Sequence, residues 1–203
     1  MKIAVIGASG RAGSQLVAEA LRRDNVVLAL ARNADSIPEA PGVERKSVNA
    51  DDAQALAAAL KGCDVALSAT RFASSSPGAI IEAVKTAGVA RLLVVGGAAS
   101  LEVARETRLI DTPHFPEAFK AEAMAGIAFL EALRLEPTLD WTYVSPSASF
   151  FEGGRTGNFR VGGDLLLVAA DGKSSISFAD FAIAMLDEVE NPRHRRARFT
   201  VGY

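Results

Sequence analysis

The length and composition of the chain fit one globular α/β domain. Of its 203 residues, 49% are hydrophobic and 23% are charged, and the net charge of −2 argues against nucleic acid or an anionic membrane as a partner. Cys63 is the only cysteine, and His114 and His194 are the only histidines. An intrachain disulfide is therefore excluded, and we expect no metal site.

Short apolar runs alternate with amphipathic stretches over the first two-thirds of the chain. This alternation is typical of a parallel sheet covered by helices. In chain order, strands are expected over residues 3–6, 26–30, 43–48, 65–68, 91–95 and 141–144. Helices are expected over 11–23, 51–62, 77–88 and 116–135, with Asp51 as the cap of the second. The pattern predicts a Rossmann-type doubly wound parallel sheet with helices on both faces.

The pattern changes after Pro146. Residues 150–177 are rich in glycine, and Asp171-Gly172 between apolar runs predicts a hairpin turn. A last helix should carry Phe181 and Met185 inward and end at Asn191, and residues 198–201 could add a strand. Because no linker interrupts the chain, we treat residues 1–203 as one domain. Residues 149–203 are its small C-terminal cap on the substrate side.

The strongest motif is the glycine loop GASGRAG at residues 7–13, between a buried strand and a helix. Three glycines in this spacing let the backbone turn tightly, approach a pyrophosphate and pack the helix on the sheet. The helix N-terminus favours an anion there. We expect residues 1–148 to bind a dinucleotide, although such a turn can also bind nothing. The contacts predicted from the loop are Gly7, Ser9, Gly10, Arg11, Ala12 and Gly13.

The end of the second predicted strand bears on the choice of cofactor. A site specific for NAD usually has a carboxylate there for the ribose 2′-hydroxyl. This chain has Arg32 and Asn33 instead, with no acid before Asp35. A guanidinium can pair with a 2′-phosphate, and Arg11 could close on the same group. The sequence therefore favours NADP(H) and leaves NAD(H) open, the alternative being that both arginines are solvated.

Other predicted cofactor contacts follow later strands, because ligands of such sheets lie beyond the carboxyl ends of the strands. Asn49, Ala50 and Asp51 follow the third strand and could recognise adenine, although Asp51 could equally be only a helix cap. Ser68, Ala69 and Thr70 follow the fourth strand and could contact ribose and pyrophosphate, and Gly96 is also expected to contact the cofactor.

Four segments resemble the atypical short-chain dehydrogenase/reductase superfamily. They are GASGRAG at 7–13, VVGGAASLEV at 94–103, DWTYVSPSASFFEGGRTGNFRVGGD at 140–164 and ISFADFAIAMLDEVENPRHRRARFTVGY at 176–203. Together these segments cover nearly the whole chain. The resemblance is closest to the NAD(P)H-binding, NmrA-like branch with its NADH-flavin reductases and biliverdin reductase B-like proteins. It implies an oxidoreductase.

The chain departs from the superfamily at the catalytic pair. Most of those dehydrogenases use Tyr-x-x-x-Lys as a proton relay, but this chain has only Tyr143 and Tyr203, and Ser147 stands four residues after Tyr143. Lys120 falls in the expected region without a tyrosine beside it. Alcohol oxidation and nucleotide-sugar isomerisation are therefore disfavoured.

A flat acceptor such as free flavin or a quinone removes the need for that relay. Water can supply the proton, so the protein needs only to position the acceptor against the nicotinamide. Phe72, Phe150, Phe151 and Phe159 lie in loops that could hold such a ring, although phenylalanines more often pack in the core. A non-catalytic NADP(H) sensor of the NmrA-like type is the alternative.

Three residues are candidates for the catalytic site. Ser100 and Ser147 follow the fifth and sixth strands and could hydrogen-bond the nicotinamide or the acceptor, and His114 could donate a proton. The alternatives are a turn cap for Ser100 and a surface position for His114. The basic cluster at residues 193–198 is expected to be solvated or to end a helix.

The sequence also bears on location and assembly. No stretch approaches the ~20 apolar residues that span a bilayer, and no export signal is recognisable at the start of the chain. We therefore expect a cytoplasmic protein. A monomer and a homodimer both remain open.

Overall fold

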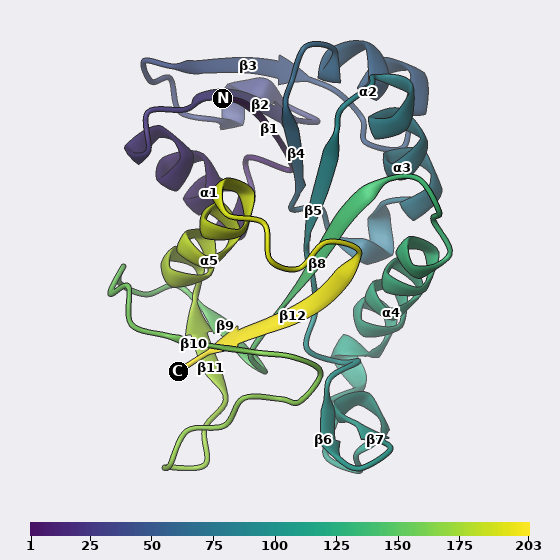
Figure 1. Cartoon of the computed structure of the whole chain (residues 1–203), viewed down its shortest axis with the longest axis vertical. Helices are drawn as coiled ribbons and strands as arrows, with labels where there is room; N and C mark the ends of the chain where they lie inside the picture. Colours follow the sequence, from purple (N-terminus) through teal and green to yellow (C-terminus); the bar gives the residue numbers. More distant parts are fainter.

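The computed structural model describes residues 1–203 and has one eight-stranded sheet at its centre (Figure 1). The chain starts in the middle of this sheet, winds outward through two strands, and then returns to build the other half. All neighbouring strands are parallel except the last pair. From one edge to the other the strands are β3 (Val43–Ser47), β2 (Val26–Ala31), β1 (Lys2–Ile6), β4 (Val65–Ser68), β5 (Arg91–Val95), β8 (Asp140–Pro146), β12 (Ala197–Gly202) and β10 (Arg160–Gly162). This order confirms the predicted doubly wound Rossmann-type sheet.

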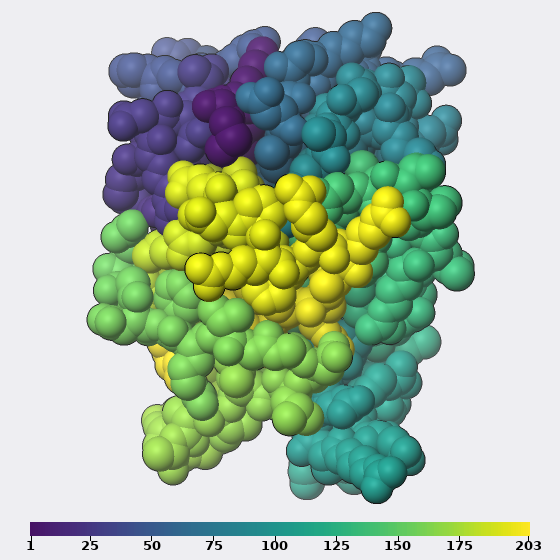
Figure 2. All heavy atoms as spheres, viewed as in Figure 1, coloured from purple at the N-terminus to yellow at the C-terminus, as the bar shows by residue number.

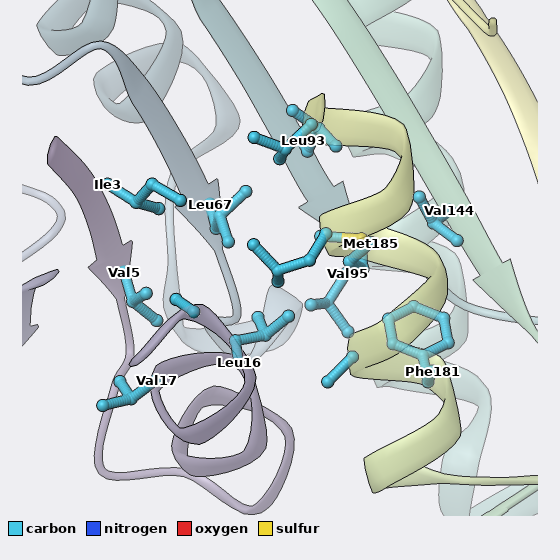
Figure 3. Close-up of a cluster of buried hydrophobic side chains, with 14 of the residues drawn as sticks. Ile3, Val5, Leu16, Val17, Leu67, Leu93, Val95, Val144, Phe181 and Met185 are labelled. Carbon is cyan, nitrogen blue, oxygen red and sulfur yellow. The ribbon is translucent and has the colours of Figure 1, made fainter. Parts of the chain in front are cut away.

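Helices cover both faces of the sheet. On one face lie α1 (Arg11–Arg22) and α5 (Phe178–Glu190), which contact each other; on the other lie α2 (Ala53–Leu60), α3 (Pro77–Thr86) and α4 (Lys120–Arg134). Figure 3 shows Leu16 of α1 and Met185 of α5 meeting the apolar side chains of the strands. A second cluster, with Leu60, Ile80 and Phe129, fills the opposite face. No helix combines the length and the apolarity that a membrane crossing requires.

The predicted cap of α2 was wrong by one residue. Asp52, not Asp51, is the N-cap, and its carboxylate accepts a hydrogen bond from the N–H of Ala55 at 2.9 Å. The shift arises because Asn49 Oδ1 accepts from the N–H of Asp51 and forms an extra turn after β3. The carboxylate of Asp51 instead accepts from the N–H of Ser76 at 2.6 Å, so it ties the start of α3 to this turn.

The segment between β5 and α4 is more structured than the sequence indicates. It contains a hairpin of β6 (Glu102–Ala104) and β7 (Thr107–Arg108), with Glu106 at φ +58° in the turn. The strands are too short for a periodic pattern, and no glycine marks the turn, so neither was predicted. The helix expected over 116–135 begins only at Lys120, after a 3₁₀ turn over Glu117–Phe119.

The residues after 148 both extend the main sheet and cover it. β12 is longer than predicted and lies between β8 and β10, while β9 (Ser149–Phe151) pairs with β11 (Ser175–Ser177) in a separate parallel ladder. Gly172 makes the predicted turn at φ +82°, but no strands flank it. In Figure 2 the loop that precedes β11 and the β6–β7 hairpin project at the lower edge, with a notch between them.

Candidate functional site

The turn from β1 into α1 is built so closely that only glycine fits at two positions. Gly7 has φ +86°, and a Cβ there would lie 2.7 Å from the carbonyl oxygen of Ala69. A Cβ on Gly13 would lie 2.2 Å from the carbonyl oxygen of Gly7. The glycines therefore bring the start of α1 against the loop that follows β4.

The start of α1 has the chemistry of an anion site. Gly10 is the N-cap and offers no side chain, and no acidic residue occupies the first turn. The first N–H groups of a helix have no partner within the helix, and the helix dipole adds positive potential there. Because no side chain caps them, these N–H groups are available, and the turn fits a diphosphate.

Beside this turn lies a cleft of about 210 Å³, which we call the glycine-loop cleft. It opens at the carboxyl ends of β1, β2 and β4, where the strand order reverses. Eight of the predicted cofactor contacts line it: Gly7, Ser9, Gly10, Arg32, Asn49, Ala50, Ala69 and Thr70.

Two arginines border the glycine-loop cleft. Arg32 follows β2 as expected, and Arg71, which the sequence analysis did not single out, follows β4. Both are exposed, and neither forms an ion pair, so the cleft carries two unpaired positive charges. The position of Arg71, directly after Thr70, was the signal that could have identified it.

The other predicted cofactor contacts do not line this cleft. The guanidinium of Arg11 lies over the ring of Phe178, 5.3 Å from its centroid. The side chain of Asn33 caps a 3₁₀ turn by accepting from the N–H of Asp35, and Ser68 is buried with its Oγ 3.4 Å from Thr70 Oγ1. Ala12 and Gly13 lie in the first turn of α1, and Gly96 faces a different pocket.

That second pocket, which we call the large pocket, has a volume of about 500 Å³. It lies beyond the carboxyl ends of β5 and β8 and beside the start of α4, and 11 of its 21 lining residues are hydrophobic. The structure brings all three catalytic candidates, Ser100, His114 and Ser147, to its wall. Phe72 and Phe150 also line it, whereas Phe151 packs against Tyr203 and Phe159 packs against the core under α5.

Tyr143 of β8 forms the floor of the large pocket, and its hydroxyl group is fully used. The hydroxyl oxygen accepts from the N–H of Gly97 at 3.0 Å, and the O–H donates to the carbonyl of Gly126 at 3.0 Å. Burial raises the pKa of this phenol above its ordinary value. The Tyr143 ring also packs directly on Gly96: a Cβ added at Gly96 would lie 2.3 Å from the ring, so no side chain fits there. Tyr143 therefore acts here as a structural support.

Glu122 of α4 lines the large pocket and holds the segment that separates the two cavities. Its role was not predicted from the sequence. Its carboxylate accepts from the N–H groups of Phe72 and Ala73, at 2.7 and 2.9 Å. This contact fixes the short segment in which Arg71 borders the glycine-loop cleft and the next residue borders the large pocket. The two cavities therefore lie next to each other, separated by the chain at Arg71 and Phe72.

The two candidate serines differ in what their hydroxyl groups contact. Ser147 is buried and donates to the carbonyl of Val201 at 3.1 Å. Ser100 is partly exposed, and its Oγ accepts from the guanidinium of Arg198 at 3.2 Å. The expectation that Arg198 is solvated was wrong: its side chain is 5% exposed, because β12 enters the sheet and carries it inward, where it pairs with Asp164.

Comparison with solved structures places this architecture among bacterial proteins of similar size. A "putative epimerase" from Bacteroides thetaiotaomicron is 39% identical with a TM-score of 0.94, covering 100% of this chain and 96% of that one. A "putative NADH-flavin reductase" from Streptococcus pneumoniae is 36% identical with a TM-score of 0.84, covering 100% and 99%. A short-chain dehydrogenase/reductase from Veillonella parvula in complex with NADP shares the fold at 16% identity and a TM-score of 0.79, covering 100% of this chain and 94% of that one.

Sequence comparison gives the family. The uncharacterized protein YwnB of Bacillus subtilis is 41% identical over 99% of this chain and 98% of its own length. The sequence model described as NAD(P)H-binding matches residues 7–192, from the glycine loop to the end of α5. The predicted atypical short-chain dehydrogenase/reductase relationship is confirmed, and the chain belongs to the NAD(P)H-binding family.

Proposed function

We propose that the chain is an oxidoreductase that passes hydride from NADPH to a flat acceptor such as free flavin or a quinone. The observation that carries the proposal is the adjacency of the glycine-loop cleft and the large, mainly apolar pocket across Arg71 and Phe72. A dinucleotide extended over the glycine loop would reach from one cavity to the other. An acceptor in the large pocket would then lie next to its reactive end.

The residues of the glycine-loop cleft would hold the cofactor. The N–H groups at the start of α1 suit the diphosphate, and Asn49 with Ala50 suits the adenine. Arg32 and Arg71 supply two unpaired guanidinium groups for a 2′-phosphate, which favours NADPH over NADH. When bound, the reduced nicotinamide supplies the hydride.

The groups of the large pocket suit an acceptor that needs no tyrosine relay. The Tyr143 hydroxyl is engaged by backbone groups, and Lys120 does not line the pocket but pairs with Glu117 at 2.5 Å. An acceptor whose reduced form takes its proton from water fits this arrangement, whereas epimerisation through a tyrosine and lysine pair does not. Phe72 and Phe150 offer aromatic surface to a planar ring. The name of the Streptococcus pneumoniae relative supports the same choice.

Steady-state oxidation of NADPH, measured with riboflavin, FMN and simple quinones, tests the proposal. We expect oxidation that depends on the acceptor and that is faster with NADPH than with NADH. Tight binding of NADPH without turnover of any of these acceptors would contradict an enzyme and favour the non-catalytic sensor.

Location needs its own measurement. A cytoplasmic location stays a prediction, because a protein from Burkholderia pseudomallei that is 41% identical, with a TM-score of 0.90, is named a putative exported protein. Fractionation of the native host, followed by detection of the chain, would decide it.

A further inference from the structure

One side chain on the wall of the large pocket is coupled to a buried positive charge. Arg198 of β12 donates from Nη1 to Ser100 Oγ at 3.2 Å, and its Nε donates to Asp164 at 2.6 Å. A buried guanidinium is costly unless it is paired and hydrogen-bonded, so Asp164 helps to keep this charge in place. Ser100, which accepts the hydrogen bond from Arg198, lines the large pocket.

The two segments that meet at Arg198 are also joined through their backbones. The N–H of Glu102 in β6 donates to the carbonyl of Asp164 at 2.9 Å, and the N–H of Leu166 donates to the carbonyl of Glu102 at 2.8 Å. The β6–β7 hairpin and the loop after β10, which both project in Figure 2, are therefore held together at their bases. This connection fixes the distance between Ser100 and the carboxylate that holds Arg198.

The direction of the hydrogen bond determines what Ser100 can do. A guanidinium has only donors, so the Ser100 oxygen must accept from Arg198 and its own hydrogen is left for another partner. The structure gives that hydrogen no protein acceptor, and the side chain lines the large pocket. A hydroxyl that accepts from a cation is a stronger donor, because hydrogen bonds polarise one another along a chain.

We propose that Arg198, held by Asp164, positions Ser100 as a donor that stabilises negative charge on the acceptor in the large pocket. This inference rests on the proposed function. Hydride transfer breaks a C–H bond of the reduced nicotinamide and gives the neutral acceptor a new bond and two electrons. The acceptor then carries negative charge on an oxygen or a ring nitrogen until water protonates it. Ser100 donates its hydrogen bond to that atom.

The other polar groups around the pocket do not duplicate this role. The carboxylate of Glu122 is engaged by two backbone N–H groups, and the hydroxyl of Tyr143 by two backbone groups. Ser147 donates to Val201. His114 also lines the pocket and forms no hydrogen bond with the protein, so its ring N–H is free, but no cation polarises it as Arg198 polarises Ser100.

The test uses 7-hydroxycoumarin, a flat phenol whose neutral and anionic forms absorb at different wavelengths. The probe is titrated with pH in the presence of the full-length protein and saturating NADP⁺. We expect the wild type to lower the pKa of the bound phenol by about one unit relative to Ser100→Ala and Arg198→Met. The double variant should behave like Ser100→Ala alone, because Arg198 acts through Ser100.

Two further variants separate this role from a general effect on the loop. Arg160 also holds the loop after β10, by donating to the carbonyl of Val168 at 2.9 Å, but it does not contact Ser100. Arg160→Met should therefore retain the full shift. Asp164→Asn keeps a polar group on an exposed position, and it should reduce the shift even if Arg198→Met fails to fold.

The possible failures are distinguishable. A probe that binds the wild type with the same pKa as it binds Ser100→Ala overturns the inference and leaves the flat-acceptor site intact. An equal loss of the shift in Arg160→Met and Arg198→Met also overturns it. A probe that does not bind the wild type at all contradicts the large pocket as a site for flat acceptors, and the proposed function fails together with the inference.

Discussion

The glycine-loop cleft and the large pocket lie side by side but are built from different chemistry. The cleft presents backbone amides and two exposed arginines without ion-pair partners. The large pocket presents mainly apolar side chains; its Tyr143 and Glu122 are hydrogen-bonded within the protein, and only the side chains of Ser100 and His114 keep a free donor. The cleft is therefore suited to hold an anionic ligand by charge, and the pocket to select a ligand by shape. Changes in the cleft should affect cofactor affinity, whereas changes in the pocket should affect the acceptor.

The largest effect is expected from Gly7→Val. A side chain at φ +86° is strained, and its Cβ would lie 2.7 Å from the Ala69 carbonyl, so the turn must move away from the start of α1. NADPH affinity, measured by calorimetry, should fall by roughly 100-fold or more. Gly154→Ala is the matched control, since its Cβ meets nothing within 4 Å. Unchanged affinity in a folded Gly7→Val protein would contradict the assignment of the cleft.

Arg32→Ala and Arg71→Ala should separate the two nicotinamide cofactors. Loss of a charge-assisted hydrogen bond to a 2′-phosphate costs about 1.5–3 kcal/mol, so each variant should weaken NADPH by roughly 10- to 100-fold and NADH little. Dissociation constants for both cofactors measure this difference. Arg105→Ala, on an exposed side chain of the β6–β7 turn, serves as the control. An equal loss for NADPH and NADH would refute the phosphate assignment.

Glu19 connects α1, the helix of the cleft, to Arg155 in the C-terminal segment. Hydrogen bonds from Arg155, Arg23 and Arg22 lower its pKa from 4.5 to about 2. A carboxyl pKa that is lower in the folded state stabilises the fold above pH 4.5, and this stabilisation is lost as the pH falls from about 4.5 to 2.

Glu19→Gln should therefore lower the free energy of unfolding at pH 7 by about 1–3 kcal/mol and make the acid destabilisation shallower. Urea unfolding at several pH values measures both effects. Glu131→Gln breaks an exposed pair with Arg134 and should change stability by less than about 0.5 kcal/mol. If the stability of Glu19→Gln fell with decreasing pH as steeply as that of the wild type, the proposed role of Glu19 and its arginine partners would be contradicted.

The smallest effect on turnover is expected from Tyr143→Phe. The change leaves the Gly97 N–H and the Gly126 carbonyl without their partner, so stability should fall by about 1–3 kcal/mol. Acceptor-dependent oxidation of NADPH should fall less than about 10-fold, since the hydroxyl is not proposed to transfer a proton. A fall of roughly 1,000-fold in kcat, with the protein still folded, would assign Tyr143 a proton-transfer role.

Local sequence was enough to predict six of the eight strands of the main sheet and the glycine loop of the cleft. The fully apolar strands and the glycine spacing each have a local physical cause, so they could be recognised without knowledge of tertiary contacts. The same is true of Ser76-Pro77 at the start of α3, where the serine caps the helix and the proline takes the first position.

The sequence could not predict contacts between distant segments in the same way. Arg198 looked like part of a solvated basic cluster because its partners, Ser100 and Asp164, are 98 and 34 residues away. Glu122 looked like an ordinary helix residue, and its two N–H partners come from the loop after β4. The hairpin of β6 and β7 is too short for periodicity, and its turn uses Glu106 in place of glycine.

Calorimetric titration of the purified chain with NADPH tests the central claim most directly. The site predicts one NADPH per chain, with a dissociation constant in the range of about 1 μM to 1 mM and weaker binding of NADH. Absence of any binding by NADPH, NADP⁺, NADH or NAD⁺ at millimolar concentration would contradict the account.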